Sequence, residues 1–471
     1  MQRAFLQYIY RRHCEFEKDY DKVNEIEQGV KKILNEILDE IGKNRSVFTN
    51  SKVIGVGSFY EKTKVGALDE FDFMIVLGNL SLPEAIAIET GCVPWYKKIR
   101  VQNSSDTYTA VFDRDNVLSN TRITEQFWGS LLAMVRQKTF AVRTKYGTIN
   151  THGCRNRKLL LKFIAENPVK NLEGNEKNNP YSKELTHIPS LNIGVDLMLA
   201  IDYPNIEEVI TSEGFPVEWR KWVEENGCHL VAKTCQSLNP CSTCWHVSLA
   251  NAESKLMFEM DAKHKQAYQV VKYLLTREVP YSGKCANLSS YMLKNAFLFH
   301  TKSEHGCVCC RDATVCVHAV FDYLIRSFKV GKMPCFFSRN INTWGPDLKF
   351  PVFCNQEGPS GFLDGKSLCV EWYALCWIEL WCRVVVRADK LLKDVKSLDD
   401  QKIQDQFKLM KESMMLIVEC YCNYRNIIQM SLSEMDSLPA GISNDVLNYN
   451  FEWYFGRLKQ SFSVKLGDLL H

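Results

Sequence analysis

The feature that most constrains the fold is a short apolar segment with acidic residues at alternate positions, residues 69–77, DEFDFMIVL. In a β-strand alternate side chains share a face, so Glu70 and Asp72 lie on one side and Phe71 and Phe73 on the other. Burying two carboxylates on one face of an apolar strand is costly unless a cation lies between them. The segment therefore predicts a strand with a cation site on one face.

A glycine-serine turn precedes this strand. Residues 53–56 predict a short strand that ends at Gly57 and Ser58. The backbone N–H groups and the hydroxyl of such a turn can bind a phosphate. The turn lacks the Gly-Lys-Ser/Thr of a Walker A loop and the third glycine of a dinucleotide fingerprint. Carboxylates together with a phosphate-binding turn favour Mg²⁺, which proteins bind through carboxylates and substrate phosphates.

A third carboxylate, Asp196, interrupts the apolar run at residues 191–201. A site with two metal ions about 4 Å apart needs such an additional acidic ligand. Taken singly, each acidic residue could be an ordinary strand-end or turn-capping residue. Taken together, and in this order after Gly57 and Ser58, we interpret Glu70, Asp72 and Asp196 as catalytic metal ligands.

The 471 residues suggest about three domains, or two large ones. Apolar residues recur at helical spacing from Val23 to Ile41, which predicts a long amphipathic helix that stops at Gly42. Strands are predicted at 53–56, 71–77, 108–112 and 191–201, helices at 157–166, 216–225, 268–275, 288–300, 317–328 and 369–424, and an exposed loop at 168–185. The pattern indicates an α+β fold with a helical second half.

The chain is nearly neutral, with 58 basic and 55 acidic side chains, so any surface for nucleic acid must be local. Between Gln126 and Ala165 there is no acidic residue, although the segment holds eight basic ones. A focused positive field of this kind is typical of a track for a phosphate backbone. The alternative is a solvated face whose acidic partners come from elsewhere. The candidate nucleic-acid-binding residues are Arg143, Lys145, Arg155, Arg157 and Lys158.

The 19 cysteines are too dilute in so long a chain for a disulfide scaffold. Arginines interrupt the N-terminus before a signal-type apolar run can form, and three charges within Cys369–Val386 favour a buried helix over a membrane span. We therefore expect a cytoplasmic protein with reduced thiols. The cysteine-rich segment 305–318 could hold zinc, but its spacing is not that of a zinc knuckle, so we favour a reduced loop.

These motifs resemble the nucleotidyltransferase superfamily that includes DNA polymerase β. More narrowly, residues 55–61 (GVGSFYE) and 69–74 (DEFDFM) are similar to cyclic GMP–AMP synthase and the animal receptors like it. The similarity continues at residues 195–202, 245–253, 271–275 and 289–294, and covers roughly residues 10–350.

The resemblance implies a bilobed nucleotidyltransferase fold, with a polymerase-β-like mixed sheet lobe and a C-terminal helical lobe. Residues 1–50 would form a spine helix packed on both lobes, 51–260 the core, and 261–471 the helical lobe. Glu70, Asp72 and Asp196 would hold two Mg²⁺ or Mn²⁺ ions, with Asp196 beside the attacking ribose hydroxyl. The implied nucleotide-binding residues are Gly57, Ser58, His246, Ser248, Glu253, Lys272, Ser289, Ser290 and Tyr291.

Within this set Ser58 would contact the donor triphosphate, Lys272 and Ser290 its phosphates, and Tyr291 a base. Without the resemblance, Lys272 would be interpreted as a solvated helix residue and Tyr291 as a core aromatic. His246 stands where the synthase has an arginine that contacts a base, so base choice is left open.

Residues 251–269 contain no cysteine, so the zinc-binding thumb with which the synthase clamps DNA is expected to be absent. A shallow basic surface suffices for an A-form duplex, and we therefore favour double-stranded RNA over DNA as the ligand. The expected activity is synthesis of a cyclic dinucleotide, cyclic GMP–AMP, from ATP and GTP in innate antiviral immunity, with a STING-type receptor for the product. The alternatives are an inactive developmental relative of the male-abnormal type and a linear oligonucleotide synthetase.

Overall fold

The structure is a computed structural model that describes residues 2–343 apart from short gaps. The gaps are 16–19, 83–84, 103–109, 114–115, 167–189, 234, 236–240, 278–288, 304–305, 308–312 and 331. Contacts within the chain divide it into two compact units, which are described separately. Among the described residues, the sheet unit contains 12–269 and 333–343, and the helical unit contains 2–11 and 270–332.

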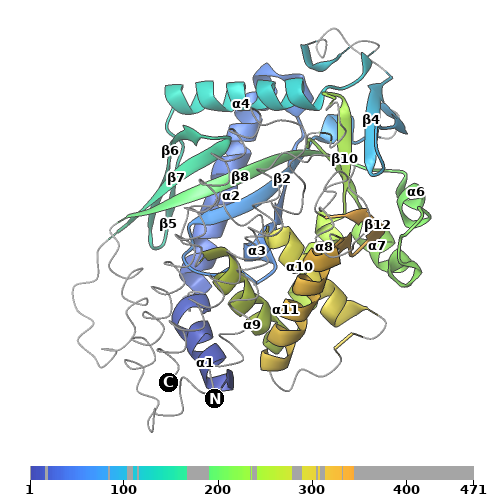
Figure 1. The fold of residues 1–471 in the computed structure, drawn as a ribbon. Helices are drawn as coiled ribbons and strands as arrows, with labels where there is room; N and C mark the ends of the chain where they lie inside the picture. The colour runs from blue at the N-terminus through green and yellow to red at the C-terminus, as the bar shows by residue number, and fades with distance from the viewer. Residues whose placement is uncertain are drawn as a thin grey trace, which may run out of the picture. The chain divides into compact units, whose positions relative to one another are not determined.

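The sheet unit is built on a mixed sheet with ten strands in the part of the chain that the structure describes (Figure 1). The strands are β1 (Lys52–Val56), β2 (Glu70–Val76), β3 (Ile86–Thr90), β4 (Tyr96–Val101), β5 (Ala141–Thr144), β6 (Gly147–Arg155), β7 (Lys158–Ala165), β8 (Ser190–Asp202), β9 (His229–Val231) and β10 (Cys244–Ser248). Their order is β3-β4-β10-β9-β8-β7-β6-β5, and β2 lies between β1 and β8. The β2–β8 pairing is parallel, and the other described pairs of this sheet are antiparallel.

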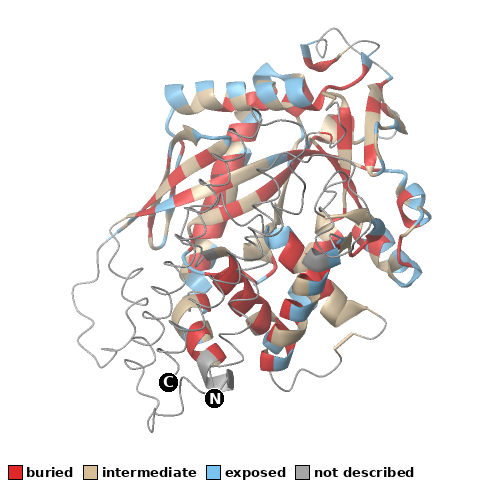
Figure 2. Cartoon of the chain, in the orientation of Figure 1, coloured by how far each residue is buried: buried red, intermediate tan, exposed pale blue. Residues whose placement is uncertain are grey.

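Helices pack on this sheet through apolar stripes. Helix α2 (Tyr20–Asn44) contacts β5, and α4 (Asn120–Gln137) contacts β6 (Figure 1). The predicted stripe of α2 is buried from Val23 to Ile41, and the strands under it alternate between buried and less buried residues (Figure 2). The helix continues two residues beyond Gly42, where a stop was predicted.

The shorter helices of the sheet unit lie between the strands or follow β10. They are α3 (Gly57–Tyr60), α6 (Ile206–Ile210), α7 (Arg220–Asn226) and α8 (Ala250–Glu259), followed by most of α9 (Ala262–Lys272). A two-stranded hairpin of β11 (Pro334–Cys335) and β12 (Ser338–Asn342) also belongs to this unit.

The helical unit contains α1 (Gln2–Ile9), α10 (Ser290–Lys302) and α11 (Ala313–Val330). Helix α11 packs against both α1 and α10. Its buried residues Val317, Phe321 and Leu324 have the spacing of one helix face, which explains why this segment forms a helix within a small apolar core. The α+β expectation is confirmed by the two units together.

Most predicted elements are present, but the helix predicted at 157–166 is wrong. The segment is strand β7, in which Leu159, Leu161 and Phe163 are buried and the residues between them are less so. Apolar Leu160 and Ile164 on the other face gave the segment the appearance of helical spacing. The strands predicted at 53–56, 71–77 and 191–201 and the helices at 216–225, 268–275, 288–300 and 317–328 are confirmed.

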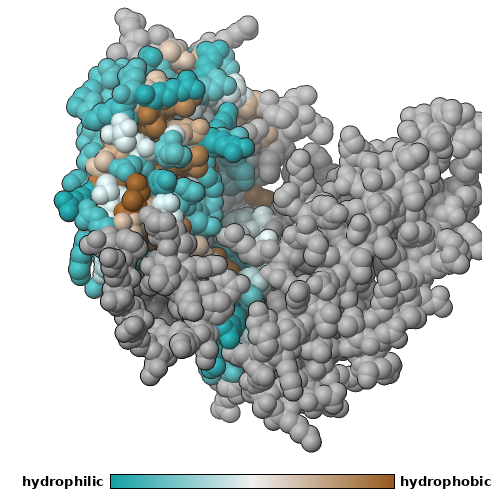
Figure 3. Space-filling model, turned by 90° about the vertical axis from the view of Figure 1, so that its left-hand side faces the viewer, coloured by the Kyte–Doolittle hydropathy of each residue, from teal (hydrophilic) through white to brown (hydrophobic). Residues whose placement is uncertain are grey.

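Other predictions fall wholly or partly outside the described residues. These are the loop at 168–185, the helix at 369–424 and the first two residues of the strand at 108–112. The other three residues of that segment do not form the predicted strand, because Ala110 and Val111 lie in a 3₁₀ turn and Phe112 forms an isolated bridge with Leu118. The apolar stretch Cys369–Val386 also lies outside them, and none of the described helices is long and apolar enough to cross a bilayer. The described surface beside β5–β7 is mostly hydrophilic, with small apolar areas (Figure 3).

Candidate active site

Three carboxylates meet where β2 and β8 run side by side. The parallel register places Asp72 opposite Asp196 and Glu70 opposite Gly194. Residues in register point to the same face, and Glu70 shares that face because it lies two positions from Asp72. One oxygen atom from each of the three carboxylates lies within 4.8 Å of the others. The structure therefore brings the three predicted metal ligands together.

The glycine-serine turn lies against this group. Strand β1 places Val56 opposite Asp72, and α3 begins at the next residue, Gly57. Gly57 has a φ of +77°, and a Cβ atom there would lie 2.3 Å from Oδ2 of Asp72. Glycine is thus required both by the backbone conformation and by the closeness of the carboxylate. Ser58 follows in the first turn of α3 and is half-buried.

Lys158, predicted to bind nucleic acid, contacts the carboxylates. Strand β7 places it opposite Asp196, and its Nζ lies 2.5 Å from Oε1 of Glu70 and 3.1 Å from Oδ2 of Asp196. Its aliphatic chain crosses Gly194, where a Cβ atom would lie 2.7 Å from Lys158 Cδ. The sequence reasoning missed this role, and the one available signal was a lysine beginning an apolar strand.

The electrostatics show an excess of negative charge. Burial, followed by the charges of Glu70 and Asp196, raises the pKa of Asp72 to about 6. Burial also raises the pKa of Asp196, although Lys158 opposes the shift. For Glu70 burial acts in the same direction, but hydrogen bonding and charge from Lys158 outweigh it and lower the pKa. Two of the three carboxylates are therefore harder to ionise than usual, and a hard divalent cation with oxygen ligands fits this group.

A second lysine, Lys64, lies beside the site and is buried. Lys64 is 4% exposed, and its Nζ lies 3.0 Å from Oδ1 of Asp69, next to Glu70. The backbone carbonyl of Asp69 accepts a hydrogen bond from the N–H of Gly194, 2.7 Å away. These two contacts hold the beginning of β2 in place.

The implied base-binding residues of the sheet unit lie on and after β10. His246 pairs with Tyr96 and Val231, and its ring meets the Tyr96 ring edge-on at 5.0 Å. Burial, with a smaller effect of the Lys233 charge, lowers the pKa of His246 to about 3. The imidazole is therefore neutral at physiological pH and can donate or accept one hydrogen bond at each nitrogen.

The other two candidates of the sheet unit, Ser248 and Glu253, lie at the end of β10 and in the helix that follows it. Ser248 Oγ accepts a hydrogen bond of 3.3 Å from the N–H of Ala250, the first residue of α8. Glu253, in the first turn of α8, is 7% exposed.

Four further candidates belong to the helical unit. Lys272 is 7% exposed, so the alternative of a solvated helix residue is wrong. Tyr291 is 41% exposed, so it is not a core aromatic. Ser289 caps α10 by accepting a hydrogen bond from the N–H of Met292 at 3.3 Å, and Ser290 is exposed.

The remaining basic candidates do not form one cluster. Arg155 and Arg157 are exposed at the β6–β7 turn, the end of β7 that carries Lys158. Arg143 and Lys145 lie at the β5–β6 turn, and Arg143 pairs with Glu166 at 3.0 Å. Nine residues of β6 separate the two turns, which at 3.3 Å per residue is roughly 30 Å.

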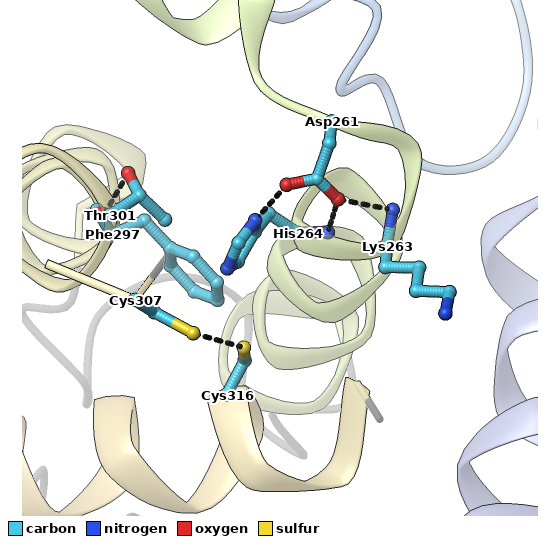
Figure 4. A network of polar contacts seen from close by, with 7 residues as sticks. All are labelled: Asp261, Lys263, His264, Phe297, Thr301, Cys307 and Cys316. Carbon is cyan, nitrogen blue, oxygen red and sulfur yellow. Dashed lines mark hydrogen bonds and ion pairs between the residues drawn. The ribbon is translucent and has the colours of Figure 1, made fainter. Parts of the chain in front are cut away.

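The cysteine-rich segment is only partly described. Cys307 Sγ and Cys316 Sγ lie 4.0 Å apart (Figure 4), and His305, Cys309 and Cys310 fall outside the described residues. Figure 4 also shows Asp261 of the sheet unit accepting hydrogen bonds from the backbone of Lys263 and from the ring of His264. Every cysteine that the structure describes is a free thiol.

Comparison with known proteins finds distant relatives. The chain is 23% identical to cyclic GMP–AMP synthase of Sus scrofa over 365 residues, which is 69% of this chain and 64% of that protein. It is 21% identical to cyclic GMP–AMP synthase of Mus musculus over 352 residues, 69% of this chain and 62% of that protein. No family model matches the chain. It thus spans slightly less than two thirds of the length of these relatives.

The predicted resemblance is confirmed. This chain is distantly similar to the cyclic GMP–AMP synthases. Its mixed sheet and helical unit are consistent with the α+β nucleotidyltransferase fold.

We expect Lys158→Met to lower stability in the absence of divalent cations, because the carboxylates lose their ammonium partner. The cost should be about 1 kcal/mol, since solvent screens groups that are one third to two fifths exposed. Mg²⁺ should restore more stability to this variant than to the parent in thermal unfolding. Lys162→Met, in the same strand, is the control. An equal response to Mg²⁺ in both variants would contradict the counter-charge role.

We expect Gly57→Ala to be more destabilising than Gly66→Ala. Both residues have positive φ, +77° and +85°, so both substitutions strain the backbone by about 1 kcal/mol. No atom lies within 4 Å of a Cβ at Gly66, whereas at Gly57 the Asp72 carboxylate must move. Chemical denaturation measures the difference, and Mg²⁺ titration should show weaker binding for Gly57→Ala alone.

Proposed function

We propose that this chain is a metal-dependent nucleotidyltransferase that joins ATP and GTP into a cyclic dinucleotide, cyclic GMP–AMP. The observation that carries the proposal is the meeting of Glu70, Asp72 and Asp196, with the Gly57-Ser58 turn against Asp72. Three carboxylates beside a phosphate-binding turn suit a reaction at a nucleoside triphosphate. The distant similarity to cyclic GMP–AMP synthases supports the same chemistry.

In this proposal Glu70, Asp72 and Asp196 hold two Mg²⁺ or Mn²⁺ ions. When bound, these ions would supply positive charge that stabilises the charge developing on the phosphate oxygens. Asp196 orients the attacking ribose hydroxyl, whose oxygen forms a bond to the α-phosphorus while the bond to pyrophosphate breaks. The hydroxyl proton passes to Asp196 or to solvent. Lys158 offsets part of the negative charge of Glu70 and Asp196 before substrate arrives.

The remaining candidates bind the nucleotides. The neutral ring of His246 contacts a base edge by single hydrogen bonds. An arginine would instead donate two parallel hydrogen bonds from a positively charged group. The exposed ring of Tyr291 provides a face on which a base stacks, and the buried ammonium of Lys272 contacts phosphate. Ser58 and Ser290 contribute hydroxyl groups to the phosphates.

Double-stranded RNA is proposed as the activating ligand, contacted through phosphates by Arg155 and Arg157, with Arg143 and Lys145 about one strand length away. An extended duplex can reach both turns, because it presents phosphates along its whole length. The product is proposed to act on a STING-type receptor in the cytoplasm.

The catalytic proposal predicts that Glu70→Ala with Asp72→Ala lowers product formation by ~1000-fold or more, since the metal ligands are lost. RNA binding should be unchanged. The assay supplies all four triphosphates and Mg²⁺ or Mn²⁺, with and without double-stranded RNA or DNA, and identifies products by mass and nuclease resistance. Product made by the double variant would overturn the metal assignment. A linear product would favour an oligonucleotide synthetase. Absence of any product from the parent protein would favour an inactive relative.

The ligand proposal predicts that Arg155→Glu with Arg157→Glu weakens RNA binding and flattens its salt dependence by about two units of log–log slope. Because these arginines lie at the same sheet end as the carboxylates, KM for ATP and GTP is measured without RNA as well. An effect confined to KM would show that Arg155 and Arg157 bind the nucleotide substrates and not RNA. Lys158 is left unchanged in this variant, because it contacts Glu70 and Asp196.

A further inference from the structure

Four cysteines from distant parts of the chain meet near one edge of the sheet. Cys92 lies in the turn between β3 and β4, Cys235 follows β9, Cys241 precedes β10, and Cys244 begins β10. Strand β10 pairs with β4 on one side and with β9 on the other, which brings the three segments together. One sulfur atom from each cysteine lies within 4.8 Å of the other three.

The spacing of the sulfur atoms fits a shared metal ion better than disulfides. A tetrahedral zinc ion with Zn–S bonds of about 2.3 Å separates its sulfur ligands by about 3.8 Å. Cys92 Sγ and Cys241 Sγ are 3.5 Å apart, whereas a disulfide would need about 2.05 Å. All four are free thiols.

The surroundings suit thiolate ligands. The backbone N–H of Cys92 donates to Sγ of Cys244 at 3.3 Å, and a hydrogen bond of this kind stabilises a thiolate. Cys241 and Cys244 have the Cys-x-x-Cys spacing of structural zinc sites. Lys98, opposite Cys244 in β4, places a positive charge on the same face as a complex that would carry two negative charges.

We propose that Cys92, Cys235, Cys241 and Cys244 bind one Zn²⁺ ion in a closed, structural site. Zinc forms four bonds to sulfur, and the protons of the thiols are released to solvent. With four protein ligands no position remains for water, so the site is not catalytic. It also lies outside residues 251–269, where the zinc-binding thumb of the synthase would be.

The site would fix the edge of the sheet. Strands β3 and β4 join the rest of the sheet through only three residue pairs of β4 with β10, within the described residues. Tyr96 packs with Cys235 and Cys244, and its ring contacts His246. A zinc ion here would therefore hold the strand that carries His246. This consequence rests on the proposed function, whereas the metal assignment does not.

The test begins with the metal content of the full chain, purified under reducing conditions and measured by plasma mass spectrometry. We expect Cys235→Ser and Cys244→Ser each to lose one equivalent of zinc. Cys228→Ser, equally buried in the same unit, should retain it. Cys307→Ser shows whether the thiols of the helical unit hold a separate ion. Zinc content unchanged in both cluster variants, or absent from the parent, would overturn the proposal.

A second measurement does not depend on the folding of the variants. Cobalt exchanged into the parent protein should give thiolate-to-cobalt charge-transfer absorption and the visible bands of tetrahedral coordination. Absence of the thiolate-to-cobalt charge-transfer absorption would overturn the assignment, whereas octahedral oxygen bands alone would come from the carboxylates Glu70, Asp72 and Asp196. So would an intact mass that shows a disulfide, instead of bound zinc, among these four residues in the reduced preparation.

The effect on base reading is measured separately. If Cys92→Ser retains synthesis but raises KM for one nucleotide, the site positions His246. If synthesis is absent in the parent while zinc is bound, the proposed function fails and the metal site stands.

Discussion

The parallel pairing of β2 with β8 is the interaction on which the candidate site depends. It joins two segments more than a hundred residues apart and places Asp72 opposite Asp196. In a parallel pair the side chains in register point to one face, so the two strands together form an acidic surface that neither could form alone. Each strand also buries apolar residues, such as Phe71, Phe73 and Val195, on the opposite face. The same apolar core therefore holds the carboxylates at a fixed separation.

The cost of placing three carboxylates together is offset within the fold. Lys158, from the antiparallel neighbour of β8, pairs with two of them, and Lys64 pairs with Asp69 beside them. Burial, and after it the charges of Glu70 and Asp196, still raise the pKa of Asp72 against the opposing charges of Lys64 and Lys158. A site of this kind attracts a divalent cation because the cation relieves a repulsion that the folded chain sustains.

The cysteine cluster lies toward the β3 end of the strand order, where the β3–β4 hairpin joins the sheet. A hairpin joined to β10 by three residue pairs has few main-chain hydrogen bonds to the rest of the sheet. A metal ion shared between the hairpin and the adjoining strands would supply a link that the short pairing lacks. The candidate base-reading strand β10 lies between them.

The sequence by itself determined the acidic strand, the glycine-serine turn and the stripe of α2, because these depend on neighbours within a few residues. Periods of two and of 3.6 are local properties, and Gly57 is required by its own φ as well as by Asp72. The sequence pattern led to a wrong prediction in β7, where the apolar residues fit both the period of a strand and that of a helix. A strand with apolar residues on both faces can resemble a helix in this way. Only the tertiary structure decided the partners of Lys158 and the separation of the basic residues into two turns. It also decided the meeting of Cys92 with Cys235, Cys241 and Cys244, because strand order and register are set by packing across the whole sheet.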